Sequence, residues 1–293
     1  MSHDASVGTV PQASSLAAIR LLRPKHWIKN LFVLAPLIFS GLFTRRVDTL
    51  RALFGTLLFC VAASLVYVLN DLADLRVDVL HPVKRLTRPL ASGAVSVTTA
   101  RVLLVVLGAI VLTGAFVSVP LSAVLIGYIL LNVLYSTWLK RIPVVDIFCV
   151  AAGFVLRVYA GAVVIEVPLS SWMLITTLSI ALYLAAIKRR DELDVQGNGA
   201  RIVLDQYTVP LLDRFALMSS VCAMVFYSLF VVTTRPVLAF TIPLVLFGIF
   251  RYWFLVDRHG RGESPTDALW SDRPLAITVL LWGILCAYLL RQP

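Results

Sequence analysis

The stretch YVLNDLADLRVDVLHPVKRLTRP, residues 67–89, follows a long apolar run and then places three aspartates, four Lys or Arg and one His close together. Apolar runs of this length are comfortable only in a membrane or a deep core. The charges that follow therefore mark the point where a helix leaves its apolar surroundings. Why so many opposite charges gather there is the question on which the function of the chain depends.

Composition identifies the chain as a membrane protein that crosses the bilayer several times. The chain has 293 residues, of which 59% are hydrophobic and 14% charged, whereas soluble domains usually carry about 25% charged residues. The net charge of +10 favours contact with anionic lipid headgroups over nucleic acid. The four cysteines lie in apolar runs and are interpreted as small buried side chains. Residues 1–15 lack the features of a secretory signal and are predicted to form a disordered cytoplasmic tail.

Hydropathy predicts an all-α architecture with nine spans in a single catalytic domain, residues 16–293. A spanning helix needs about 20 mostly apolar residues. The first candidate span is short, contains Pro36 and follows an amphipathic segment typical of the membrane interface. The nine candidates are residues 28–43, 50–70, 99–118, 120–139, 143–165, 170–187, 212–233, 236–255 and 273–290.

The distribution of Lys and Arg predicts a cytoplasmic N-terminus. With that orientation, twenty of the 26 Lys and Arg residues lie on the inner side, five lie outside, and Arg157 lies within a span. The long connections 71–98, 188–211 and 256–272 then all face the cytoplasm. We therefore expect a multi-pass protein of the bacterial cytoplasmic (inner) membrane, with its active site on the cytoplasmic face.

The aspartates suggest a magnesium site. Asn70, Asp74 and Asp78 are spaced i, i+4 and i+8, which predicts one stripe of oxygens on a helix, with Asp71 beside it. Mg²⁺ prefers one or two carboxylates together with substrate phosphates and water. The alternative is a solvated helix end with incidental charges, but closely spaced acids near a low dielectric favour a bound cation.

Basic residues follow the acids directly. Lys84, Arg85 and Arg88 lie in a segment bounded by Pro82 and Pro89, and they are suited to hold phosphate oxygens. Acids for a metal beside bases for phosphates are what a diphosphate substrate requires. The two charge sets then need not neutralise each other, because a Mg²⁺–diphosphate can lie between them.

Further charged residues occur at the inner ends of other spans. Asp146 and Arg157 are eleven residues apart on one face of the fifth span, so Arg157 is either functional or paired with Asp146. Arg189 and Arg190 are typical of positive-inside anchors. The remaining candidates are Lys25 and Lys29 before the first span, Tyr135, Lys140 and Arg141 after the fourth, and Lys188 and Glu192 after the sixth.

The motif NDLADLRVD, residues 70–78, resembles the first aspartate-rich motif of the UbiA superfamily of intramembrane prenyltransferases. This resemblance implies nine helices around a central cavity that binds Mg²⁺–diphosphate. Most members carry a second aspartate-rich motif after the sixth span, where this chain has KRRDELD, residues 188–194. That departure and the segments RPKHWIKN, HPVKRLTRPLASG and LRVYAGA are similar to the decaprenyl-phosphate phosphoribosyltransferase branch, whose motif would read KRYAEL and so differs at Arg190 and Asp191.

The branch resemblance implies a transfer of 5-phosphoribose from phosphoribosyl pyrophosphate (PRPP) to a polyprenyl phosphate, for lipid-linked arabinose and cell-envelope glycan precursors. It implies that Asn70 and Asp74 hold Mg²⁺ and that Asp78, Lys188 and Glu192 line the catalytic cavity with Asp74. Lys188 also counts as a predicted PRPP ligand. The other implied PRPP contacts are Lys29, Tyr67, Lys84, Lys140 and Arg157.

Two alternatives remain open at this point. One is a prenyltransferase that moves an isoprenoid from its diphosphate onto an aromatic acceptor, which the basic KRRDEL disfavours. The other is an anion transporter, whose sequence would show inverted repeats and interrupted helices in matching halves. The expected partners are PRPP, the polyprenyl phosphate lipid and possible further copies of the chain, without nucleic acid.

Overall fold

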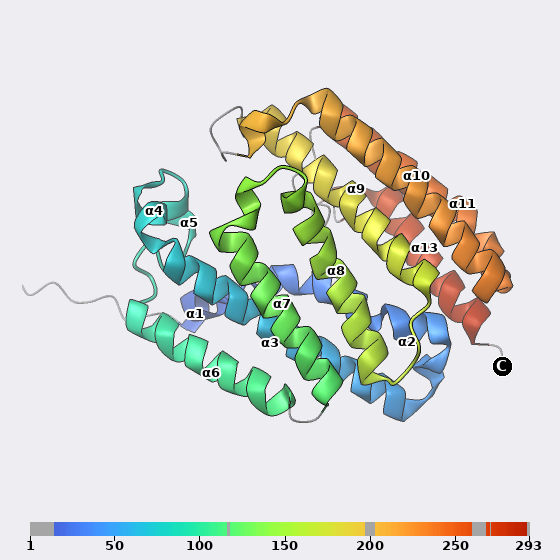
Figure 1. Cartoon of the computed structure of the whole chain (residues 1–293), viewed down its shortest axis with the longest axis horizontal. Helices are drawn as coiled ribbons and strands as arrows, with labels where there is room; N and C mark the ends of the chain where they lie inside the picture. Colours follow the sequence, from blue (N-terminus) through green and yellow to red (C-terminus); the bar gives the residue numbers. More distant parts are fainter. Residues whose placement is uncertain (1–14, 116–117, 197–202, 260–267, 270, 292–293) are drawn as a thin grey trace, which may run out of the picture.

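The computed structural model describes residues 15–115, 118–196, 203–259, 268–269 and 271–291 (Figure 1). Within these ranges the chain is helical and contains no strand. Eight helices are long and apolar enough to cross a membrane, and they coincide with eight of the nine predicted spans. They are α3 (Arg46–Ala73), α6 (Val97–Ala115), α7 (Val119–Thr137), α8 (Val145–Val164), α9 (Ser171–Gln196), α10 (Val209–Thr234), α11 (Ile242–His259) and α13 (Arg273–Leu290).

The first predicted span has a different backbone from the other eight. The short helix α1 (Ser15–Leu21) is followed by the 3₁₀ helix η1 (Pro24–Leu34), α2 (Ala35–Ser40) and η2 (Leu42–Thr44). A 3₁₀ helix rises about 2.0 Å per residue against about 1.5 Å in an α-helix. The eleven residues of η1 and the six of α2 therefore extend about 31 Å, close to the roughly 30 Å of a bilayer core.

Three helices begin with the same local arrangement. Ser118, Thr208 and Asp272 each accept a hydrogen bond from the backbone N–H three residues later, and each is followed at the second position by proline. A polar N-cap satisfies an otherwise free N–H, and proline near the start of a helix sacrifices no intrahelical hydrogen bond. These caps fix where α7, α10 and α13 enter the bundle.

The first segment packs closely against α8. A Cβ atom at Gly161 would lie 1.9 Å from the carbonyl oxygen of Val33, so only glycine permits this approach of two backbones. On the other side, Phe59 of α3 and Tyr128 of α7 contribute to a buried cluster that also contains Val33. A second cluster joins α9, α10, α11 and α13 around Tyr183 and Tyr252.

Many large apolar side chains are exposed on the outside of the bundle, among them Val105, Phe240 and Phe250. In a soluble protein such a surface would be costly, but in hydrocarbon it costs nothing. This surface and the eight apolar helices identify a membrane-embedded protein.

The predicted connections contain more helix than expected. The segment 71–98 includes the end of α3, α4 (Leu75–Leu80) and α5 (Lys84–Thr87), which lie beyond the end of α3 (Figure 1). α9 continues to Gln196, so the first part of the predicted connection 188–211 is helical, because its Lys, Arg and Glu are good helix formers. The 3₁₀ helix η4 (Leu204–Gln206) precedes α10, and η5 (Pro236–Thr241) precedes α11. Residues 197–202 and most of 260–270 lie outside the described ranges, as do residues 1–14 of the predicted tail 1–15, whose last residue, Ser15, begins α1.

Candidate functional site

Charged side chains gather at the end of the bundle where α3, α7 and α9 finish and α8 and α10 begin, here called the charged end. α3 ends in a bend at Asp74, which has φ −87° and ψ −2°. The Asp74 N–H donates to the Asn70 carbonyl, and the Asp78 N–H donates to the Asp74 carbonyl, both at 2.9 Å. The helical spacing of the motif is therefore kept from α3 into α4.

Two of the three aspartates lie in a network with arginine, here called the arginine–aspartate cluster. Asp71 is 2% exposed, and its Oδ1 accepts from Arg23 Nη2 at 2.6 Å and from Arg88 Nη1 at 3.2 Å. The same Arg88 nitrogen also donates to Asp78 Oδ2. Lys84 Nζ lies 3.6 Å from Asp78 Oδ1. Asp71 and Asp78 are thus largely neutralised by side chains of the protein.

The prediction that Asn70, Asp74 and Asp78 form one stripe is corrected by this arrangement. At about 100° per residue, Asp78 lies about 80° around the helix from Asn70 but only about 20° from Asp71. It therefore joins Asp71 on Arg88. The side chains of Asn70 and Asp74 are half-buried and make no hydrogen bond or ion pair with any residue that the structure describes.

The donor set at Asn70 and Asp74 fits a magnesium ion that is completed by a substrate. No group of three or more His, Cys, Asp or Glu side chains within the described ranges could by itself hold a metal. One carboxylate and one amide oxygen, both without a partner among the described residues, are what Mg²⁺ uses when phosphates and water supply its other ligands. The sequence also predicts Asp71 and Asp78 as metal ligands; in the structure both carboxylates are engaged with basic side chains.

The aromatic ring of Tyr67 lies beside the arginine–aspartate cluster. The Arg23 guanidinium carbon is 5.0 Å from the centroid of the Tyr67 ring, and the His26 ring centroid is 5.5 Å away. Tyr67 also packs against the cluster that contains Tyr128 and Phe59. Among the other predicted phosphate ligands of this region, Lys29 is half-buried and Arg85 is exposed.

The end of α9 is organised around Arg189. This buried side chain donates to Asp146 Oδ2 at 2.7 Å, to Glu192 Oε2 at 2.6 Å and to the Tyr135 hydroxyl at 2.8 Å. Lys188 lies at the edge of this network, with its Nζ 3.8 Å from Glu192 Oε1. The network ties α9 to the end of α7 and the start of α8.

Arg189 and Arg190 make specific contacts between helices, which their interpretation as positive-inside anchors does not include. Arg190 contacts Asp213 of α10 at 2.8 Å and Asp257 of α11 at 3.5 Å, so both arginines join helices instead of facing headgroups. The spacing of Arg189 and Glu192, i and i+3, was the available local signal. Asp146 is 43 residues distant, and no sequence spacing points to it.

A strained turn connects this network to Lys140. Val144 has φ 67° and ψ −46°, and the Val145 N–H donates to the Pro143 carbonyl at 2.7 Å. This is a γ-turn with positive φ, which is rare and strained, above all for a β-branched residue. The Val144 N–H donates to the Tyr207 hydroxyl at 2.5 Å.

Tyr207 in turn donates to Asp146 Oδ1 at 2.7 Å. Burial and this hydrogen bond raise the pKa of Tyr207 well above its usual value, so the hydroxyl stays protonated. The turn fixed in this way directly follows η3 (Leu139–Arg141), which carries the predicted ligand Lys140. Lys140 makes no hydrogen bond or ion pair with the described residues.

Arg157 is not paired with Asp146. Eleven helical residues extend about 16 Å, which is too far for contact. The Arg157 side chain, 6% exposed, donates to Asn30 Oδ1 at 2.8 Å, to the Gly153 carbonyl at 2.7 Å and to the Tyr128 hydroxyl at 3.1 Å. Its guanidinium carbon also lies 4.9–5.4 Å from the ring centroids of three aromatic residues: Phe59, Tyr128 and Phe154.

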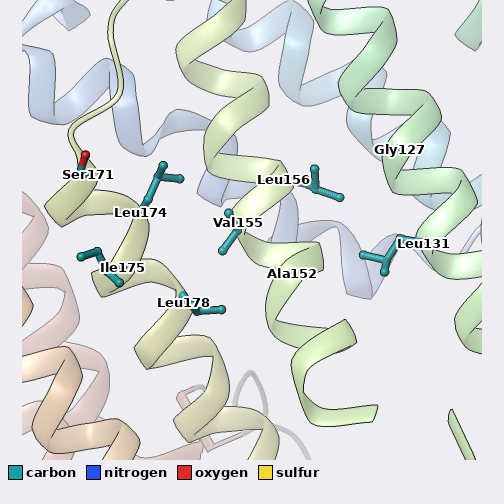
Figure 2. A pocket seen from close by; sticks show the side chains of 9 residues that line it. All are labelled: Gly127, Leu131, Ala152, Val155, Leu156, Ser171, Leu174, Ile175 and Leu178. Carbon is teal, nitrogen blue, oxygen red and sulfur yellow. The ribbon is translucent and has the colours of Figure 1, made fainter. Parts of the chain in front are cut away.

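An apolar pocket of about 640 Å³ lies between α7, α8 and α9 (Figure 2). Leu131 of α7, Leu156 of α8 and Leu178 of α9 are among its lining residues, and Ser171 at the start of α9 is its one polar side chain. It contains none of the predicted site residues. Its surface suits hydrocarbon.

A model of the UbiA prenyltransferase family matches residues 33–271. A Mycobacterium tuberculosis protein named decaprenyl-phosphate phosphoribosyltransferase is 34% identical over 295 residues, covering 96% of this chain and 96% of that protein. A Corynebacterium glutamicum protein of the same name is 34% identical over 280 residues, covering 90% and 83%.

Solved structures agree with the fold. A UbiA homolog from Archaeoglobus fulgidus, determined with GPP and Mg²⁺ bound, superimposes with a TM-score of 0.72 at 21% identity. The superposition covers 94% of this chain and 99% of that one. At this identity the likeness establishes the fold alone.

Proposed function

Because the chain belongs to the UbiA prenyltransferase family, we propose that it is the enzyme that transfers 5-phosphoribose from PRPP to a decaprenyl-type polyprenyl phosphate. The observation that carries this proposal is the 34% identity, over 96% of both chains, to a protein named for that activity. The product would supply lipid-linked arabinose and cell-envelope glycan precursors.

The end of α9 supports this choice of donor over an isoprenyl diphosphate. Where most family members have a second aspartate-rich motif, Arg189 engages both Asp146 and Glu192. Carboxylates held in this way are poor ligands for a second metal. Lys188 and Lys140 instead add positive charge, which PRPP needs because it carries a second phosphate about one ribose away from the diphosphate.

The reaction needs few groups from the protein. An oxygen of the lipid phosphate forms a bond to C1 of the ribose, and the bond from C1 to the diphosphate oxygen breaks, so that diphosphate leaves with the electron pair. Lys84, Lys140 and Lys188 would bind donor phosphates and stabilise the charge that develops on the leaving group. The phosphate nucleophile is already anionic, so the protein need not supply a strong base.

Asn70 and Asp74 would hold Mg²⁺ against the donor diphosphate, where the ion supplies charge stabilisation of the leaving group. Asp78 would act through Arg88 and Lys84, which it holds in place. Arg157 would position the site indirectly, because its hydrogen bond to Asn30 fixes the segment η1, which carries Lys29.

The test of this proposal is turnover by the purified full-length protein. Labelled PRPP, Mg²⁺ and decaprenyl phosphate should yield a phosphoribosyl lipid and free diphosphate, and EDTA should abolish both. Consumption of geranyl diphosphate with an aromatic acceptor, without use of PRPP, would establish the prenyltransferase alternative. Uptake of unchanged PRPP into proteoliposomes would establish a transporter.

We further propose that nine segments cross the inner membrane and that the charged end faces the cytoplasm, as the distribution of Lys and Arg favours. Ser92→Cys should then react with an impermeant reagent only from the cytoplasmic side, and Thr234→Cys only from the opposite side. Labelling of the parent chain, which has four native cysteines, gives the background signal to be subtracted. Labelling of Ser92→Cys from outside would reverse the proposed orientation.

A further inference from the structure

A second polar pocket lies beside Asp71, about a quarter turn around the α3 axis from Asn70. Its volume is about 330 Å³. Its walls come from the N-terminal segment and from the connection after α3, two regions that are distant in sequence. Its polar lining residues are Arg20, Arg23, His26, Asp71, Thr87 and Arg88.

The two arginines at the back of the pocket are held in place by the fold. Arg23 and Arg88 both donate to Asp71 Oδ1, and each guanidinium retains N–H donors that this bond does not use. Arg23 has φ 54° and ψ 57°, a left-handed conformation that a non-glycine residue adopts at a cost. That conformation lies at the junction of α1 and η1.

Two groups of the pocket have no partner in the part of the chain that the structure describes. Arg20 makes no ion pair with the described residues. Asp71 Oδ2 is shielded from solvent and has no hydrogen-bond partner among the side chains and backbone that the structure describes. An anion that also carries a hydroxyl would satisfy both groups. A phosphate monoester is such an anion in its monoanionic form, which retains one P–OH. Its second pKa is about 6, so the dianion predominates in water near neutral pH, and the proposal requires that hydrogen bonding to Asp71 Oδ2 keeps the proton on the bound phosphate.

The surroundings of the pocket are apolar. Leu16 and Ile19 of α1 are 67% and 51% exposed, and Leu86 of α5 is 74% exposed. Ile19 and Leu86 directly precede the pocket residues Arg20 and Thr87. Exposed apolar side chains next to cationic ones at the end of a membrane bundle suit a ligand with a phosphate head and a hydrocarbon chain.

We propose that this pocket binds the phosphate monoester of the polyprenyl acceptor. The proposal rests on the phosphoribosyl-transfer function and adds the location of the second substrate. Tyr67, whose ring contacts Arg23, precedes Asn70 and Asp71 by three and four residues on α3, so all three lie at the same helix end. Donor and acceptor phosphates would then bind on adjacent faces of the same helix end, as attack on C1 of the ribose requires.

Arg20→Ala tests the proposal with little risk to the fold, because Arg20 is exposed and stabilises no described carboxylate. Arg101→Ala, an exposed arginine at the start of α6 outside the pocket, is the matched control. The full-length enzyme in nanodiscs is assayed for the KM of decaprenyl phosphate and the KM of PRPP. Binding of decaprenyl phosphate without PRPP is measured separately.

We expect Arg20→Ala to raise the acceptor KM and the acceptor Kd about five- to tenfold, as for one charged contact near the surface. The KM of PRPP and all parameters of Arg101→Ala should be unchanged. Arg20→Glu should weaken the acceptor further. Inorganic phosphate at millimolar concentration should compete poorly, since it lacks the chain.

Three results would overturn the proposal while leaving the phosphoribosyl-transfer function intact. The first is a raised KM for PRPP alone, which would assign the pocket to the donor. The second is unchanged acceptor affinity in both Arg20 variants. The third is displacement of decaprenyl phosphate by phosphatidylglycerol with equal affinity, which would make the pocket a general site for anionic lipids. Absence of turnover in the parent enzyme would instead contradict the proposed function.

Discussion

The ends of α3 and α9 both bring acidic and basic side chains together, but they satisfy them differently. At α9, Arg189 is buried and donates to two carboxylates and a tyrosine hydroxyl. At α3, Asp71 and Asp78 are engaged by arginine, whereas Asn70 and Asp74 make no polar contact with described side chains. We call the Arg189 network closed, because the protein itself satisfies its charges. We call the face of α3 with Asn70 and Asp74 open, because these side chains have no partner among the described residues.

This difference indicates which end of the two helices stabilises the fold and which end takes part in the reaction. A buried charge needs a partner, and the protein itself supplies the partners of Arg189. Polar groups without a partner at the end of a membrane helix are costly unless a ligand completes them. We therefore expect changes at α9 to act mainly on stability and changes at Asn70 and Asp74 to act mainly on turnover.

The largest effect should come from Arg189→Ala. The substitution leaves Asp146 buried without its cation and leaves Glu192 with only the more distant Lys188, and loss of one partner of a buried ion pair typically costs about 3–5 kcal/mol. Thermal unfolding in detergent should show a strong loss of stability before any assay is attempted. Arg190→Ala is the control, since its partners Asp213 and Asp257 are more exposed and such pairs contribute about 1 kcal/mol or less. Equal melting temperatures for the two variants would refute the closed network.

The next effect is that of Asp74→Asn, which tests the open face. It should reduce kcat two to three decades, about 2.7–4 kcal/mol, as for loss of a group that stabilises the transition state. The melting temperature should not change, because the Asp74 side chain has no described partner. Asp48→Asn, in the first turn of the same helix, is the matched control. A large fall in melting temperature would show that Asp74 is structural and would remove the contrast between the two ends.

Lys188→Ala probes the border of the closed network. Its side chain is 38% exposed and its amine lies 3.8 Å from Glu192, so it can reach a ligand while Arg189 still satisfies that carboxylate. We expect kcat/KM for PRPP to fall ten- to a hundredfold, about 1.5–3 kcal/mol, with unchanged stability. Arg258→Ala, exposed at the end of α11, should behave as the parent. If Lys188→Ala changed only the melting temperature, Lys188 would belong to the closed network.

The smallest effect concerns the turn at Val144. Val144→Gly should stabilise the protein by about 1 kcal/mol, because glycine tolerates positive φ. Tyr207→Phe should destabilise it by about 1–3 kcal/mol through loss of its two hydrogen bonds. In a double-mutant cycle, the cost of Tyr207→Phe should be smaller in the Val144→Gly background by at least roughly 0.5 kcal/mol. Strict additivity would show that Tyr207 does not hold the turn.

The sequence predicted those features that depend on local spacing. Eight spans coincide with helices because each is a continuous apolar run. The contact of Lys188 with Glu192 follows from their spacing, since i and i+4 residues meet on any helix. The separation of Asp78 from Asn70 could also have been found, because the drift over eight residues follows from 3.6 residues per turn.

Features that depend on tertiary contacts could not be predicted. Arg189 contacts Asp146 and Tyr135 across 43 and 54 residues, and Tyr207 contacts Val144 across 63. Arg23 was assigned only to the inner side by its charge, although it pairs with Asp71 across 48 residues. In each case the partner is distant in the sequence, so local hydropathy and spacing give no sign of the contact.

The contact of Gly161 with the Val33 carbonyl has a consequence for how the protein is made. Residues 33 and 161 are separated by 128 positions, and at about 5–20 residues per second the ribosome needs roughly 6–26 s to add them. During that interval α8, against which the first segment packs, has not yet been synthesised. Arg157 is therefore not yet present to donate its hydrogen bond to Asn30. We expect the nascent N-terminal segment to stay open to protease until α8 emerges, so that the first residues synthesised are among the last to acquire their final conformation.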